Sequence, residues 1–182
     1  MSRPRPWRRL KTGEERDFTI LRIREDTFVD PRNDSAHPRV IITVPDWVTV
    51  VAFTQAQEAI LIRQFRFGAE ANTLEIPGGA VDAGETPAAA AARELEEETG
   101  FRAARVVFLG AVHPNPALQT NRCHTFLALD CVATTAATPD AGEDIEVVLV
   151  AKQALRGLVK AGTITHALVV AALYFAELEG AL

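Results

Sequence analysis

The chain has 182 residues, which is the length of one ordinary domain or of one domain with a small extension. Its hydrophobic content of 48% is typical of a globular protein, and its net charge of −5 argues against nucleic acid as the main partner. The basic start is not followed by the apolar segment of a signal peptide, and no apolar run is long enough to span a bilayer. We therefore expect a cytoplasmic protein without a membrane partner.

In chain order, the pattern predicts a mostly β chain with one central helix and a helical tail. Residues 1–12 are predicted to be a loose arm, and 30–38 a loop rich in turn residues. Strands are predicted from alternating or β-rich runs at 18–25, 40–44, 47–54, 59–67, 73–76, 105–112, 123–131 and 145–150. Helices are predicted at 87–99, 152–161 and 165–178. This order indicates the α/β or α+β class.

The central helix has the clearest end signals in the chain. Thr86 is the expected N-cap, Pro87 takes the favoured first position, and Gly100 is a typical C-terminal glycine. The two cysteines, Cys123 and Cys131, lie in one predicted strand and are interpreted as buried thiols.

The most informative feature is the acidic run at the end of this helix. At about 100° per residue, Glu94, Glu97 and Glu98 share one arc, beside an apolar stripe that is expected to face the sheet and consists of Ala88, Ala91, Ala92 and Leu95. Carboxylates this close weaken a helix and raise one another's pKa unless a cation lies between them. Mg²⁺ suits such a set, because it binds a few carboxylates and keeps positions for water and phosphate oxygens. The alternative is a solvated acidic helix face.

Arg93 lies on another arc of the same helix. We expect it to point away from the three carboxylates and to reach back to Glu85, tying the preceding loop to the helix. The glycines of that loop, Gly78, Gly79 and Gly84, permit tight turns and the close approach of a backbone carbonyl to a metal.

The run 79–101 resembles the Nudix box, G-x5-E-x7-R-E-U-x-E-E-x-G-U, at every fixed position. The resemblance implies a Nudix-type α/β/α sandwich with a mixed sheet, and Mg²⁺-dependent hydrolysis of a nucleoside diphosphate linked to another group. Manganese is the alternative metal. It also implies that Glu94, Glu97 and Glu98 are metal ligands, with the Gly78 carbonyl as a fourth. The catalytic base is then a box glutamate or a glutamate from a distant loop.

Outside the box, LIRQFRFG at 61–68 and LEIPGG at 74–79 resemble the ADP-ribose and nucleoside diphosphate sugar pyrophosphatase branch. The likeness makes Arg66, Glu75 and Arg122 candidates for substrate binding, although Arg66 and Arg122 could be exposed strand charges. Glu143, in a later loop, is the candidate second base or third metal ligand, and the alternative is a solvated loop acid. Residues 1–45 are expected to form an N-terminal arm and β extension that mediates homodimerisation, with the Nudix domain at 46–182.

The leading hypothesis is therefore an enzyme that cuts the pyrophosphate of ADP-ribose or a similar nucleotide sugar into a nucleoside monophosphate and a sugar phosphate. The alternatives are hydrolysis of dinucleoside polyphosphates or nucleoside triphosphates. A different class is a non-catalytic domain that senses ADP-ribose. The sequence identifies neither the base nor the sugar.

Overall fold

The computed structural model describes residues 3–134, 136–138, 142 and 144–182. Contacts within the chain divide it into two compact units. The first contains Met1–Pro45 and His113–Arg122, and the second contains Asp46–Val112 and Cys123–Leu182. The loop His113–Arg122, expected within the domain at 46–182, thus makes its contacts with the N-terminal segment.

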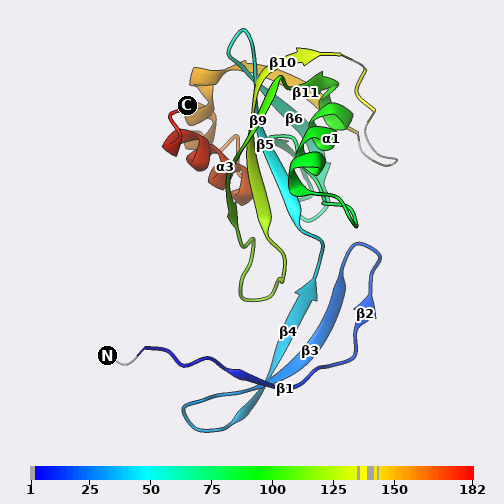
Figure 1. Ribbon diagram of the computed structural model, residues 1–182, viewed down its shortest axis with the longest axis vertical. Helices are drawn as coiled ribbons and strands as arrows, with labels where there is room; N and C mark the ends of the chain where they lie inside the picture. The colour runs from blue at the N-terminus through cyan, green and yellow to red at the C-terminus, as the bar shows by residue number, and fades with distance from the viewer. Residues whose placement is uncertain (1–2, 135, 139–141, 143) are drawn as a thin grey trace. The chain divides into compact units, whose positions relative to one another are not determined.

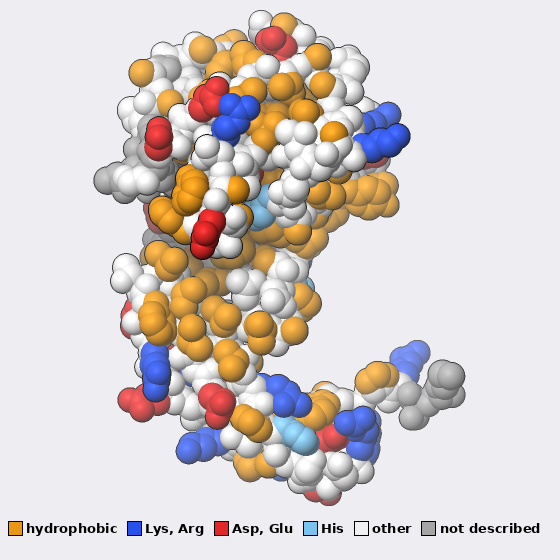
Figure 2. Space-filling view, turned by 180° about the vertical axis from the view of Figure 1, so that it is seen from behind, with side chains coloured by type: hydrophobic (Ala, Val, Ile, Leu, Met, Phe, Trp, Pro, Cys, Tyr) orange, Lys and Arg blue, Asp and Glu red, His pale blue; other side chains and the backbone are white. Residues whose placement is uncertain are grey.

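The first unit is built on an antiparallel sheet (Figure 1). Its strands are β1 (Arg8–Lys11), β2 (Arg16–Asp17), β3 (Arg22–Val29) and β4 (Ala36–Thr43). β3 pairs with the other three. Its buried Asp26 accepts hydrogen bonds from the Gly13 N–H and from Arg24, so a charged network crosses the sheet. Figure 2 shows lysine and arginine side chains spread over one face of this unit.

Three predictions for this unit are wrong. β4 begins at Ala36, within the loop predicted at 30–38 and before the strand predicted at 40–44. The arm predicted at 1–12 contains a strand, Arg8–Lys11, which pairs with β3. The strand predicted at 18–25 instead begins at Arg22, because the preceding residues form a tight turn. In that turn the Phe18 N–H donates to the Leu21 carbonyl at 2.9 Å, and Thr19 has a φ of 69°. A positive φ at a β-branched residue gives no signal in the sequence pattern.

The second unit contains a mixed seven-stranded sheet. Its strands are β5 (Trp47–Thr54), β6 (Glu58–Arg66), β7 (Ala71–Glu75), β8 (Phe101–Arg102), β9 (Arg105–Val112), β10 (Cys123–Ala133) and β11 (Glu146–Ala151). The main path runs β11-β6-β5-β10-β8, with β7 paired to β6 and β9 paired to β10. β5 and β10 are parallel, and the other pairs are antiparallel. The mixed sheet agrees with the predicted fold class.

Helices cover the two faces of this sheet (Figure 1). They are α1 (Pro87–Thr99), the short η1 (Lys152–Ala154), α2 (Leu155–Lys160) and α3 (Ala167–Leu178). Side chains alternate along β5: Val50 packs in the cluster that contains Leu95 of α1, whereas Val51 and Phe53 pack in the cluster that contains α3. Within the described residues, no helix is both long and apolar enough to cross a membrane.

The predicted ends of α1 are confirmed. Thr86 Oγ1 accepts from the Ala89 N–H at 3.2 Å, and Gly100 adopts the left-handed conformation with a φ of 74°. The apolar stripe is rotated from the prediction, because Ala88 and Ala92 are exposed whereas Ala90 is buried. This rotation places the Glu98 carboxylate on the buried face with Ala91 and Leu95. Both cysteines are free and buried, as predicted.

Candidate active site

The loop after β7 brings backbone groups against the carboxylates of α1. The Pro77 and Gly79 carbonyls accept hydrogen bonds from β5, at 2.8 and 2.9 Å. Gly78, between them, faces the opposite way, and its N–H donates to Glu98 Oε2 at 2.8 Å. A Cβ on Gly78 would lie 2.2 Å from the Val48 carbonyl oxygen, so only glycine fits this approach. The backbone of this loop is therefore held in contact with both β5 and the helix.

The second glycine packs directly against Glu94. A Cβ at Gly79 would lie 2.3 Å from Glu94 Oε1. Glu98 is only 2% exposed. The loop and helix thus enclose two of the three carboxylates predicted to bind metal, and the third, Glu97, is more exposed.

Arg93 connects the acidic groups of this region. Its guanidinium binds both oxygens of Glu85 at 3.1 Å, so the predicted tie between loop and helix is present. The expectation that Arg93 points away from the carboxylate arc is wrong, because Nη1 lies 2.9 Å from both Glu94 Oε1 and Glu97 Oε2. A long side chain reaches across helical arcs that a wheel separates, and crowded carboxylates attract it.

These contacts change the acidity of the cluster. The hydrogen bond from Arg93 holds the pKa of Glu85 below its ordinary value, against the opposing effect of burial. The hydrogen bond to Glu85 is likewise the main reason that the pKa of Arg93 is raised. Glu85 therefore stays ionised at neutral pH, and the guanidinium of Arg93 offsets part of the negative charge of the cluster.

The residues fit a divalent cation chemically. Three carboxylates and a backbone carbonyl are the hard oxygen ligands that Mg²⁺ prefers. In the part of the chain that the structure describes, the Gly78 carbonyl accepts no hydrogen bond. Among the same residues, no three acidic, histidine or cysteine side chains are grouped as a metal ion requires. Arg93 makes the contacts to Glu94 and Glu97 that a cation would replace.

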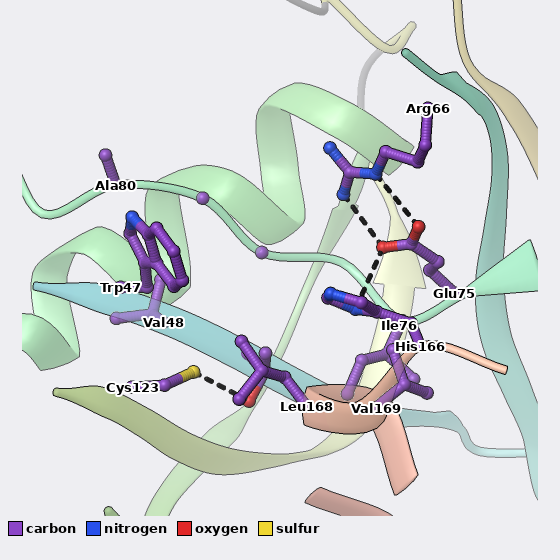
Figure 3. Close-up of a pocket in the computed structure, with 13 residues that line it drawn as sticks. Trp47, Val48, Arg66, Glu75, Ile76, Ala80, Cys123, His166, Leu168 and Val169 are labelled. Atoms are coloured by element: carbon purple, nitrogen blue, oxygen red, sulfur yellow. Dashed lines mark hydrogen bonds and ion pairs between the residues drawn. The ribbon is translucent and has the colours of Figure 1, made fainter. Parts of the chain in front are cut away.

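A pocket of about 380 Å³ opens beside the Gly78–Gly79 loop. This volume is in the range of small-molecule sites, roughly 300–1,000 Å³. Arg66 and Glu75 line it, and the Arg66 guanidinium binds the carboxylate through Nε at 2.9 Å and Nη2 at 2.8 Å (Figure 3). Burial alone would raise the pKa of Glu75, but the hydrogen bonds from Arg66 and Thr73 outweigh it and lower the pKa. The structure therefore brings these two predicted substrate-binding residues together.

The same pocket contains residues outside the predicted site, and one of them, His166, was not predicted from the sequence at all. His166, immediately before α3, has Nδ1 3.4 Å from Glu75 Oε2, and Trp47 and Cys123 also line the cavity (Figure 3). Burial raises the pKa of the Cys123 thiol to about 11. A histidine at the start of a predicted helix carries no signal of its own, and its contact with Glu75 joins positions far apart in the chain.

The remaining predicted residues are Arg122 and Glu143. Arg122 is exposed at the end of the loop that belongs to the first unit, and it does not line the cavity. Glu143 lies outside the described residues. Glu96, on the same helix as the metal candidates, pairs with Arg102, with Oε1 2.6 Å from Nη2. Glu96 therefore serves as a control residue, on the same helix, for the three glutamates that are predicted to bind metal.

A mixed sheet between helices, with a carboxylate helix packed on a glycine loop, is the architecture of a hydrolase that acts on phosphoanhydrides. Residues 45–173 match the model of the NUDIX domain, and the chain belongs to the Nudix hydrolase family. Members of this family generally use divalent metal ions.

Two relatives show which branch of the family this chain resembles, and one solved structure matches its fold. The chain is 33% identical over 155 residues to an ADP-ribose pyrophosphatase of Bacillus subtilis (strain 168), covering 85% of this chain and 84% of that protein. It is 32% identical over 131 residues to an ADP-sugar pyrophosphatase of Mus musculus, covering 65% of this chain and 60% of that protein. A crystal structure of an ADP compounds hydrolase matches all of both chains with a TM-score of 0.86 at 21% identity. The latter confirms the predicted fold.

Proposed function

We propose that this enzyme hydrolyses the pyrophosphate bond of ADP-ribose or a related nucleoside diphosphate sugar, with Mg²⁺ as its metal and Mn²⁺ as the alternative. The observation that carries the proposal is the contact between the Gly78–Gly79 loop and Glu94 and Glu98, at the edge of the pocket that holds Arg66 and Glu75. The similar proteins named ADP-ribose pyrophosphatase and ADP-sugar pyrophosphatase support the same substrate class.

The residues of the site have separate roles in this reaction. Glu94, Glu97, Glu98 and the Gly78 carbonyl would hold the metal, which offsets phosphate charge and activates water. Arg93 would give up its contacts to Glu94 and Glu97 while its pair with Glu85 keeps the loop in place.

The substrate is held by the pocket. Arg66, fixed by Glu75, presents a guanidinium of set orientation to the diphosphate. The oxygen of water forms a bond to one phosphorus, and the bond from that phosphorus to the bridging oxygen breaks. A box glutamate or Glu143 accepts the proton of the water. With ADP-ribose the products are AMP and ribose 5-phosphate.

The first unit supplies the proposed contact between two subunits. Large hydrophobic side chains are exposed there, including Leu10, Phe18 and Ile20, which is 77% exposed. A homodimer through residues 1–45 would cover such side chains. Light scattering should therefore report a dimer, and Ile20→Glu should shift it toward the monomer. An unchanged mass for that variant would place the interface elsewhere. We also propose a cytoplasmic location.

The substrate proposal is tested by a phosphatase-coupled assay with Mg²⁺, Mn²⁺ or EDTA. The phosphatase releases phosphate from AMP and ribose 5-phosphate but not from intact ADP-ribose. Nucleoside triphosphates, which a phosphatase attacks directly, are followed instead by the release of pyrophosphate with an inorganic pyrophosphatase. We expect the highest kcat/KM with ADP-ribose or another ADP-sugar, lower values with dinucleoside polyphosphates and nucleoside triphosphates, and no activity in EDTA. A preference for triphosphates would overturn the assignment of substrate class, and binding of ADP-ribose without turnover would favour the sensor alternative.

A further inference from the structure

The imidazole of His166 is held next to a buried carboxylate without a formed hydrogen bond. His166 precedes α3, but its side chain does not cap that helix. Nδ1 is buried and has no hydrogen-bond partner among the described residues, although Glu75 Oε2 is 3.4 Å away. The ring projects into the pocket, and the side chain is 40% exposed (Figure 3). One edge of the ring thus faces Glu75 and the other faces the cavity.

The Glu75 carboxylate has an acceptor position left for the His166 ring. Glu75 accepts from Arg66 Nε and Thr73 Oγ1 at Oε1, and from Arg66 Nη2 at Oε2. An ionised carboxylate offers about four acceptor positions, so one remains on the side of His166. Leaving a buried nitrogen without a partner is destabilising. A small movement of the ring would therefore be favourable, since it forms the Nδ1–H to Oε2 bond.

In the neutral form of the imidazole, that bond decides which hydrogen bonds Nε2 on the opposite edge can make. With the proton of the neutral imidazole on Nδ1, Nε2 carries a lone pair and can only accept a hydrogen bond. A hydroxyl group can donate to this nitrogen, whereas an ionised phosphate oxygen cannot. The charge next to the His166 ring is the buried carboxylate of Glu75, which repels a phosphate at this point, whereas the diphosphate of the proposed function binds at the Arg66 guanidinium. The local charges favour a neutral hydroxyl.

We propose that His166, oriented by Glu75, binds a sugar hydroxyl of the substrate and so contributes to its selection. This inference rests on the proposed function, because that function supplies a substrate with two sugars. The hydroxyl belongs either to the sugar beyond the diphosphate or to the ribose of the nucleoside. The chemistry at Nε2 is the same in both cases.

The test is calorimetric binding to a Glu98→Gln enzyme, in which turnover is suppressed, with and without His166→Phe. Phenylalanine keeps a planar ring and removes both nitrogens. Loss of one hydrogen bond should weaken the binding of ADP-ribose about 10-fold. In the His166→Phe variant, the affinity for ADP should stay unchanged if His166 binds the sugar beyond the diphosphate. It should fall as much as the affinity for ADP-ribose if His166 binds the ribose of the nucleoside. Pyrophosphate, which has no hydroxyl donor of this kind, should bind equally to both proteins.

Two results would overturn the inference. One is unchanged affinity for ADP-ribose, and the other is a parallel loss of pyrophosphate affinity, which would assign the ring to phosphate. His166→Asn should restore part of the ADP-ribose affinity, and it serves as the second variant if His166→Phe lowers the melting temperature. Since binding is measured without turnover, absence of hydrolysis by the wild-type enzyme would refute the proposed function alone.

Discussion

Replacing Arg93 by glutamine should destabilise the metal-free enzyme far more than the metal-loaded enzyme. The guanidinium is 28% exposed and binds three carboxylates, those of Glu85, Glu94 and Glu97. Hydrogen bonds between charged groups contribute about 1.5–3 kcal/mol each, but they share one cation and are not additive. Removing one partner of a partly buried pair leaves the other charges uncompensated. We therefore expect Arg93→Gln to lower the free energy of unfolding of the metal-free enzyme by about 3 kcal/mol.

The loss is measured by urea and thermal unfolding in EDTA and in saturating Mg²⁺. For a chain of this size, about 1 kcal/mol corresponds to about 2–4 °C in Tm, so Arg93→Gln should lower Tm by about 6–12 °C in EDTA. Mg²⁺ should recover a large part of this, because a cation between Glu94 and Glu97 relieves the repulsion that the variant leaves.

A second arginine provides the matched control. Arg102 pairs with Glu96 of the same helix, but it is 65% exposed. Exposed pairs contribute about 0–1 kcal/mol, so Arg102→Gln should change Tm by at most about 4 °C, equally with and without Mg²⁺. If Arg93→Gln behaves like Arg102→Gln, Arg93 does not hold the acidic cluster together. If its loss is the same in EDTA and Mg²⁺, the cation does not replace its contacts.

The two loop glycines and the two cysteines give further predictions. Gly78→Ala places a methyl 2.2 Å from a backbone oxygen of β5 and should destabilise the fold by several kcal/mol. Gly79→Ala instead places a methyl against the carboxylate end of Glu94, so it should lower activity with little change in Tm. Equal losses of Tm in the two variants would contradict this. Burial raises the pKa of Cys123 and Cys131 from 9.0 to about 11, so native thiols should react slowly with a disulfide reagent at pH 8 and rapidly in urea. The pKa values of these thiols are higher in the folded than in the unfolded protein, so their contribution to the free energy of unfolding is complete below pH 9 and is lost as the pH rises toward 11. Cys131→Ser should reduce this loss of stability at alkaline pH.

Local rules account for what the sequence predicted well. The ends of α1 follow from Thr86, Pro87 and Gly100, whose preferences depend only on nearby backbone geometry. The strands at 47–54 and 105–112 have the predicted bounds because each is a short continuous run rich in apolar and β-branched residues.

The failures come from contacts that a local pattern does not encode. The turn at Thr19 displaces a strand through one unusual backbone angle. Arg93 occupies the carboxylate arc because a flexible side chain follows charge rather than the angle of its Cβ. His166 and Glu75 meet only because α3 packs on the sheet beside the end of β7. Substrate specificity depends on such distant pairs, so the sequence predicts the reaction better than the substrate.

The most direct test of the account compares Mg²⁺-dependent hydrolysis of ADP-ribose by the wild-type, Glu98→Gln and Glu96→Gln enzymes. Glu98 is buried against the Gly78 N–H, whereas Glu96 pairs with Arg102 at the surface. Removing a charge that acts on the reacting groups should lower kcat/KM by roughly 100-fold or more in Glu98→Gln, with folding retained. Glu96→Gln should stay within about 2-fold of wild type, as surface pairs contribute little. Full activity in Glu98→Gln, or equal losses in both variants, would contradict the proposed site.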